Sequence, residues 1–150
     1  MLKHLALLLW LALSPIDQSS TPVLRGTWTA SAGKQVFHGT WSAQAVPNSP
    51  DAANGSWALL NQSNQIVMMG TWSAVKTPRS WSGTWQARIV PAGGRGTPGR
   101  PMSGTWRADI GSSDQRTLGE LLQESLEREI TGAWQSGPLS GRWSLKGSPR

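Results

Sequence analysis

The chain of 150 residues contains no cysteine, which excludes disulfide bonds, thiol nucleophiles and thiolate metal sites. It has no tyrosine and one phenylalanine, so its ten tryptophans supply nearly all of its aromatic surface. Charged residues make up only 15%, and bases exceed acids to give a formal net charge of +6. With 17 glycines and 10 prolines, this is neither a long-helix protein nor a charge-rich disordered chain. The length predicts one domain with one core.

The N-terminus carries the pattern of an export signal. Lys3 precedes an apolar run from Leu5 to Leu13, which has the length of a signal-peptide h-region and is too short for a membrane span of roughly 20 residues. No Ala-x-Ala cleavage triplet follows, and Pro15 blocks the nearest small-residue site, so a retained membrane anchor is the alternative. We predict that residues 1–20 are a signal peptide or anchor. Residues 21–150 then form the folded domain, which is secreted, periplasmic or held in the cell envelope.

The rest of the chain repeats one short motif, Gly-x-Trp. Residues two before each glycine and two after each tryptophan are mostly apolar or small, whereas the positions between them are threonine, serine, glutamine or arginine. This period of two, with one dry and one polar face, predicts half-buried antiparallel strands. The eight copies are Gly26/Trp28, Gly39/Trp41, Gly55/Trp57, Gly70/Trp72, Gly83/Trp85, Gly104/Trp106, Gly132/Trp134 and Gly141/Trp143.

Each glycine shares its face with a tryptophan, and this has a physical reason. A strand glycine leaves a gap in which the indole of a neighbouring strand can lie, and it lets the sheet coil. Turns are predicted at 32–34, 48–51, 61–64, 77–78 and 137–138, and an exposed loop at 91–101. We therefore predict an all-β, eight-stranded antiparallel up-and-down meander barrel. An open sheet wrapped around a helix is the alternative.

One segment departs from the strand pattern. Leu118, Leu121, Leu122 and Leu126 fall on one helical stripe, and Thr117 with Glu120 forms a capping box. We predict an amphipathic helix over about residues 117–130, inserted before the last hairpin.

Five of the strand centres resemble those of avidin and streptavidin, and in part the Gly-x-Trp start of lipocalins. They read LRGTW, WSGTW, MSGTW, ITGAW and LSGRW, at residues 24–28, 81–85, 102–106, 130–134 and 139–143. The resemblance spans nearly the whole mature chain and implies an avidin-like or lipocalin-like barrel. Where the avidin pattern places polar groups that hold biotin, this chain has Ala30, Trp41 and Ala43. Trp81 resembles a pocket tryptophan of that family, but Arg79 replaces the nearby threonine. The resemblance therefore favours the barrel and opposes biotin as the ligand.

We expect no catalytic site. His38 is the only histidine beyond the presumed signal and falls on the polar face of its strand, and the carboxylates Asp51, Asp109 and Asp114 are not paired in a way that favours acid/base chemistry. The glycine-rich stretch 93–96 does not open a helix, so it does not predict a phosphate site. No metal-ligand cluster is present, and no cofactor is implied. The sequence indicates a non-enzymatic protein.

The tryptophans are expected to form a core ladder, some of them beside a small cavity, because eight indoles would fill much of a narrow barrel. The candidate ligand-binding residues are Trp81 and Trp85, which share one face of one strand, together with Trp41 and Trp106. Six cations and no acid lie between Lys76 and Arg107. Of these, Arg95, Arg100 and Arg107 are candidates for contact with an anionic surface or partner; export argues against a nucleic acid.

Three hypotheses remain. In the first, an exported barrel binds a small, largely apolar ligand or a protein partner. In the second, a structural subunit of an envelope complex has a solid tryptophan-packed core. In the third, an outer-membrane barrel turns its Gly/Trp/Ala face to lipid, which the mid-strand position of the aromatics opposes; a carbohydrate-binding module is a further alternative.

Overall fold

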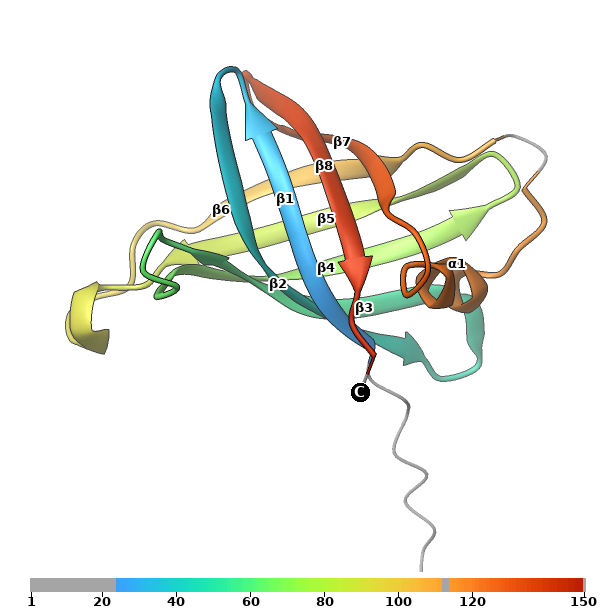
Figure 1. The fold of residues 1–150 in the computed structure, drawn as a ribbon, viewed down its shortest axis with the longest axis horizontal. Helices are drawn as coiled ribbons and strands as arrows, with labels where there is room; N and C mark the ends of the chain where they lie inside the picture. Colours follow the sequence, from blue (N-terminus) through green and yellow to red (C-terminus); the bar gives the residue numbers. More distant parts are fainter. Residues whose placement is uncertain (1–23, 112–113, 150) are drawn as a thin grey trace, which may run out of the picture.

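A computed structural model describes residues 24–111 and 114–149 (Figure 1). Eight strands form one closed barrel in which every strand pairs antiparallel with its neighbours in sequence, and β1 closes the barrel against β8. This confirms the predicted up-and-down barrel and excludes the open sheet. The predicted N-terminal signal or anchor lies outside the described residues. The strands are β1 (Leu24–Ala32), β2 (Gln35–Val46), β3 (Ser49–Leu60), β4 (Ile66–Thr77), β5 (Ser80–Ile89), β6 (Met102–Ala108), β7 (Ile130–Ser136) and β8 (Leu139–Gly147).

The barrel has two unlike ends. At the end that we call the open end lie the connections β1–β2, β3–β4, β5–β6 and β7–β8, and the third of these carries a short 3-10 turn, η1 (Ala92–Gly94). At the other end, the closed end, lie β2–β3, β4–β5 and the long β6–β7 connection, which carries α1 (Leu118–Glu124). In Figure 1, η1 and α1 lie on opposite sides of the molecule.

The turns lie where the sequence predicts them, with one correction. Gly33 and Gly137 adopt the left-handed conformation, at φ 59° and 55°, that two-residue hairpins require. The β2–β3 turn, predicted over residues 48–51, is shorter, because β3 already begins at Ser49. Asn48 takes a φ of 60°, and this tight turn lets pairing resume at once.

The helix is shorter than predicted. The capping box of Thr117 and Glu120 is confirmed, but α1 ends at Glu124 instead of about residue 130. The buried Ser125 ends it, because both its backbone N–H and its hydroxyl donate to the carbonyl of Leu122. The carbonyl of Ser125 then accepts a hydrogen bond of 2.7 Å from the Gly147 N–H, which connects the chain to the end of β8.

Glycine and tryptophan exchange places across each open-end hairpin. In β1 and β2, Gly26 pairs with Trp41 while Trp28 pairs with Gly39. The other three hairpins have the same reciprocal register, so each of the eight motif tryptophans pairs with a glycine. The further pairs are Gly55 with Trp72, Trp57 with Gly70, Gly83 with Trp106, Trp85 with Gly104, Gly132 with Trp143 and Trp134 with Gly141.

The structure shows why these positions must be glycine. A Cβ on Gly55 would lie 1.8 Å from the carbonyl oxygen of Ser42 and 2.7 Å from Nε1 of Trp72. The indole of Trp72 instead reaches across the bare backbone and donates from Nε1 to the Ser42 oxygen, at 3.0 Å. The same arrangement of indole, glycine and carbonyl recurs at Trp41/Gly26/Lys146, Trp106/Gly83/Ser73 and Trp134/Gly141/Ser31.

The tryptophans form two layers inside the barrel. The odd-numbered strands contribute Trp28, Trp57, Trp85 and Trp134, whose successive rings meet edge-to-face with centroids 5.6 to 6.4 Å apart. The even-numbered strands contribute a second layer farther from the open end, consisting of Trp41, Trp72, Trp106 and Trp143. Edge-to-face contact is the geometry that indole rings favour. The side chains of alternate strands therefore line the barrel in layers.

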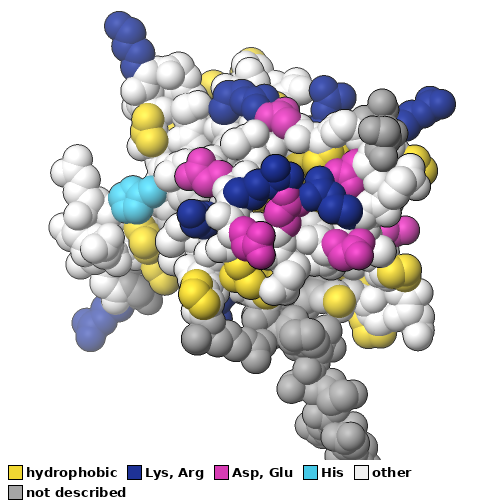
Figure 2. Space-filling model, turned by 45° about the vertical axis from the view of Figure 1, so that its right-hand side comes forward, with side chains coloured by type: hydrophobic (Ala, Val, Ile, Leu, Met, Phe, Trp, Pro, Cys, Tyr) yellow, Lys and Arg dark blue, Asp and Glu magenta, His cyan; other side chains and the backbone are white. Residues whose placement is uncertain are grey.

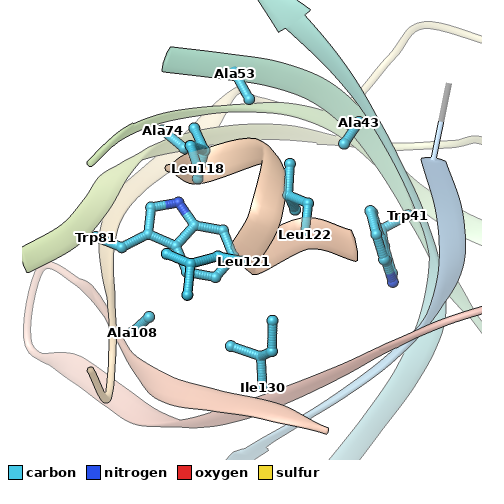
Figure 3. Packing of buried hydrophobic residues seen from close by; sticks show 10 residues of the cluster. All are labelled: Trp41, Ala43, Ala53, Ala74, Trp81, Ala108, Leu118, Leu121, Leu122 and Ile130. Atoms are coloured by element: carbon cyan, nitrogen blue, oxygen red, sulfur yellow. The ribbon is translucent and has the colours of Figure 1, made fainter. Parts of the chain in front are cut away.

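The core lies at the closed end. Leu118, Leu121 and Leu122 of α1 are buried and pack into the barrel between Trp81 and Trp41, as Figure 3 shows. Alanines complete this layer on the surrounding strands, where a larger side chain would leave no room for the helix; they are Ala43, Ala53, Ala74 and Ala108. The helix thus closes one end of the barrel.

Candidate functional site

A cavity of about 650 Å³ occupies the barrel above the helix. All nine tryptophans of the described residues line it, Leu122 of α1 borders it at the closed end, and turn residues such as Gly33 and Pro138 surround its mouth at the open end. The expectation of a small cavity is therefore wrong. The reason is that the indoles lie against the wall, across their partner glycines, where their N–H groups donate to backbone carbonyls. The barrel axis is therefore left open.

The lining changes from apolar to polar along the axis. Tryptophan, alanine, methionine and leucine side chains form the walls. The only polar side chains in the lining are Gln35, Ser136 and Ser140, and all three lie within two residues of an open-end turn. The remaining lining groups are Phe37, proline and glycine. The site can thus enclose an apolar body and offer hydrogen bonds to a polar group at the mouth, which is the usual plan of small-molecule pockets.

The structure brings the four predicted ligand-binding tryptophans to this cavity, at different depths. Trp85 belongs to the layer near the mouth and Trp106 to the deeper layer, and both are half-buried. Trp41 and Trp81 are 6% and 1% exposed and form the base of the cavity with α1. Trp81 contacts Trp106 edge-to-face, with centroids 5.3 Å apart. Trp81 and Trp85 therefore line one cavity, but Trp81 is chiefly a packing residue.

Sequence reasoning missed more than half of the lining. The other five indoles are equivalent members of the two layers, and four aliphatic or aromatic side chains near the mouth also contribute to the wall. The period-two pattern could have predicted these lining residues, because each of them lies on the same strand face as the motif tryptophan. They are Trp28, Trp57, Trp72, Trp134 and Trp143, with Phe37, Leu59, Met68 and Met102.

Trp81 also carries an unsatisfied hydrogen-bond donor. Its Nε1 is buried and has no partner among the described residues, whereas Trp41, Trp72 and Trp106 all donate to backbone carbonyls. Figure 3 shows this nitrogen turned toward Ala74 and Leu118. A buried donor without a partner costs about 1–3 kcal/mol, so the packing of this ring must outweigh that penalty.

The three arginines predicted to contact an anionic partner do not form one site. Arg95 and Arg100 lie in the β5–β6 connection at the open end. Arg107 lies on the outer face of β6, one residue from its closed-end terminus. There, hydrogen bonds from Arg142 and Thr131 chiefly lower the pKa of Asp109, and the charge of Arg107 adds a smaller contribution. The predicted contact set therefore divides between the two ends of the barrel.

A second hollow, of about 450 Å³, lies on the polar outer wall over β2–β5. Its side chains bond to one another: the hydroxyls of Ser42 and Ser56 are 2.9 Å apart, and those of Ser73 and Thr84 are 3.0 Å apart. The indoles that border it belong to the inner layers, so it offers no flat aromatic platform on which a sugar could stack. This wall does not support the carbohydrate-binding alternative.

Ion pairs fasten the β6–β7 connection to α1. Arg116 contacts the carboxylates of both Asp114 and Glu124, and Glu124 also contacts Arg128. Nζ of the buried Lys76 donates to the carbonyl of Asp114 at 3.0 Å and to that of Thr77 at 2.8 Å. The side chain of Asp114 is only 8% exposed. These contacts hold the helix in the closed end.

We expect acid to loosen this end of the barrel. Hydrogen bonds from the Arg116 side chain lower the pKa of Asp114 from 3.8 to about 2, against an opposing effect of burial. Because the folded-state pKa is the lower one, the stabilisation is complete above about pH 4 and is lost as the pH falls toward 2. Asp114→Asn should therefore have a lower melting temperature than the unmodified protein at pH 6. Between pH 4 and 2, its melting temperature should fall less than that of the unmodified protein. Circular dichroism melts would show this, with the exposed Asp51→Asn as the control; an unchanged acid profile in Asp114→Asn would contradict it.

Comparison of the chain with profiles of known protein families, with curated proteins and with solved structures gives no match. Across the residues that the structure describes, no helix is both long and apolar enough to cross a membrane.

Proposed function

We propose that this protein is a non-enzymatic, exported binding protein that holds a small, largely apolar molecule inside its barrel. The observation that carries the proposal is the tryptophan-lined cavity of about 650 Å³, open at one end and lined with polar side chains only at its mouth. Its volume falls within the roughly 300–1,000 Å³ that is typical of ligand pockets. The proposal also includes secretion or a periplasmic or envelope location, for which the N-terminal sequence pattern is the support.

Two alternative hypotheses fit the structure less well. A structural subunit with a solid tryptophan core requires a filled interior, but the cavity occupies it. An outer-membrane barrel of the kind considered requires the Gly/Trp/Ala face to point outward, but the cavity lining and the buried alanines place that face inside. The interior chemistry and the strand order support a barrel of the avidin-like or lipocalin-like kind. The inner positions Ala30 and Ala43 support an apolar ligand in place of biotin.

Binding can be tested with N-phenyl-1-naphthylamine, a neutral apolar fluorophore that fluoresces weakly in water. We expect saturable, 1:1 enhancement of its fluorescence and quenching of the tryptophan emission by energy transfer, because all nine described indoles surround the cavity. Ala30→Phe places a ring in the cavity and should weaken binding at least about tenfold, the equivalent of roughly 1.4 kcal/mol. Thr29→Phe, at the neighbouring exposed position on the outer wall, is the matched control.

Equal binding by Ala30→Phe and Thr29→Phe would show that the probe does not occupy the barrel. Absence of saturable binding to the unmodified protein, for this probe and for linear fatty alcohols of increasing length, would reject the ligand-binding function. Far-ultraviolet circular dichroism of each variant checks that the barrel is folded.

A further inference from the structure

The open end of the barrel carries an unusual number of exposed apolar side chains. Of the seven large hydrophobic residues that are exposed in the described chain, five lie within two residues of a strand terminus at this end. They come from β2, β4, β5, β6 and β8, and so surround the mouth of the barrel. The five, which we call the apolar rim, are Val36, Ile66, Ile89, Met102 and Leu139, exposed by 74%, 46%, 50%, 37% and 55%.

The acids of the protein are distributed unequally between the two ends. Four exposed cations lie at the open end: Lys34 in the β1–β2 turn, Arg88 near the end of β5, and Arg95 and Arg100 in the β5–β6 connection. None of them forms an ion pair with another described residue. Every acid within residues 24–111 and 114–149 lies toward the closed end, either near the β2–β3 turn or in the segment 109–129.

The closed end carries charges of both signs. Figure 2, with the α1 side brought forward, shows acidic side chains gathered among basic ones on that face. Among the described residues of this end, Arg116 and Arg128 form ion pairs with Glu124, and Arg142 forms one with Asp109. The two ends thus differ both in net charge and in exposed apolar surface. The open end carries five of the seven exposed large hydrophobic residues, four cations outside ion pairs and, among the described residues, no acid.

We propose that the open end docks on an anionic lipid bilayer. Exposed aliphatic side chains that enter the interface, surrounded by cations that attract acidic headgroups, are the two contributions that hold peripheral proteins on membranes. The apolar rim supplies the first and the four cations the second. Docked in this way, the mouth of the cavity faces the bilayer. The inference concerns the rim alone, so it stands whether or not the cavity binds a ligand.

The test is co-sedimentation of the full-length protein with vesicles of phosphatidylcholine alone or of phosphatidylcholine and phosphatidylglycerol in equal parts. We expect binding to the anionic vesicles that weakens as salt is raised from 0.05 to 0.5 M, because salt screens exposed charges over a Debye length of about 10 Å at 0.1 M. Lys34→Glu/Arg95→Glu/Arg100→Glu should reduce that binding by at least about tenfold, since each basic residue contributes roughly a factor of five.

A matched triple variant separates position from net charge. Arg25→Glu/Arg79→Glu/Lys146→Glu makes the same change in charge with exposed residues away from the open end, and should bind nearly as well as the unmodified protein. For the apolar contribution, Val36→Ser should weaken binding several-fold, whereas Val75→Ser should not. Val75 is a comparably exposed valine, at 53%, near the closed end of β4. All variants retain residues 1–23, so any binding by that segment is common to them.

Three results would overturn the proposal. The first is an absence of vesicle binding by the unmodified protein, including the case in which it binds heparin, an acidic polymer, but not vesicles. The second is equal binding to neutral and anionic vesicles. The third is an equal loss of binding in the two triple variants, which would show that vesicle binding depends on net charge and not on the position of the cations. Ligand binding, measured with N-phenyl-1-naphthylamine in solution without vesicles, is read separately, so failure of one proposal leaves the other intact.

Discussion

Gly55→Ala should destabilise the barrel by about 3 kcal/mol or more, or prevent folding. The added Cβ would lie 1.8 Å from the carbonyl oxygen of Ser42, which belongs to the backbone of the neighbouring strand and cannot rotate away. It would also displace the indole of Trp72 and break its hydrogen bond to that oxygen. Overpacking costs about 1–3 kcal/mol and a lost hydrogen bond about 0.5–1.5 kcal/mol. Urea unfolding followed by far-ultraviolet circular dichroism measures the difference.

The same substitution elsewhere supplies the control. Gly119 lies exposed in α1, and the nearest atom to an added Cβ is the hydroxyl oxygen of Thr117 at 3.9 Å. Because alanine favours the helix, Gly119→Ala should raise stability by roughly 0.5–1 kcal/mol. A Gly55→Ala variant as stable as the unmodified protein would show that the strands can separate to admit a side chain. The close contact of indole, glycine and carbonyl would then not hold the wall together.

The barrel could be predicted because its information is local and repeated. Alternation with period two assigns each residue to a face, and the Gly-x-Trp motif marks the centre of every strand. Once eight such strands follow one another with short turns, closure of β1 against β8 is the simplest way to leave no unpaired edge. The end of the helix was harder to predict from the sequence. The leucine stripe continues to Leu126, but the hydroxyl of Ser125 bonds back to Leu122 and stops the helix first.

The volume of the cavity could not be predicted. It depends on the side-chain torsion angles of the indoles, whereas the sequence pattern shows only on which face of a strand each residue lies. An indole that pointed toward the barrel axis would fill the interior, whereas one that lies across a glycine leaves it open. The orientation of the indoles follows from hydrogen bonding, because Nε1 of Trp72 and of Trp106 donates to a backbone carbonyl on the wall.

The division of the arginines between the two ends follows from strand direction and from where each connection leaves the barrel. The sequence positions of the cations alone do not predict at which end each arginine lies.

The tryptophans should not contribute equally to stability, and Trp81 should contribute most. Its ring is 1% exposed, packs among the leucines of α1 and meets both Trp106 and Trp143 edge-to-face. Trp81→Ala removes this support from under the helix and should lower the free energy of unfolding by about 3–5 kcal/mol. Trp57 lines the cavity and is half-buried, so Trp57→Ala should lower it less, by roughly 1–2 kcal/mol. Urea unfolding of both variants measures the contrast.

Trp81→Phe separates the packing of the ring from its N–H group. Phenylalanine keeps much of the ring surface against α1 and removes the one buried donor that has no partner among the described residues. The lost volume and the relieved penalty, the latter about 1–3 kcal/mol, act in opposite directions, so this variant should recover most of the stability that alanine loses. If Trp81→Ala proves no less stable than Trp57→Ala, the helix does not depend on this ring. If Trp81→Phe is as unstable as Trp81→Ala, the indole nitrogen has a hydrogen-bond partner at the base of the barrel, and its N–H group contributes to stability.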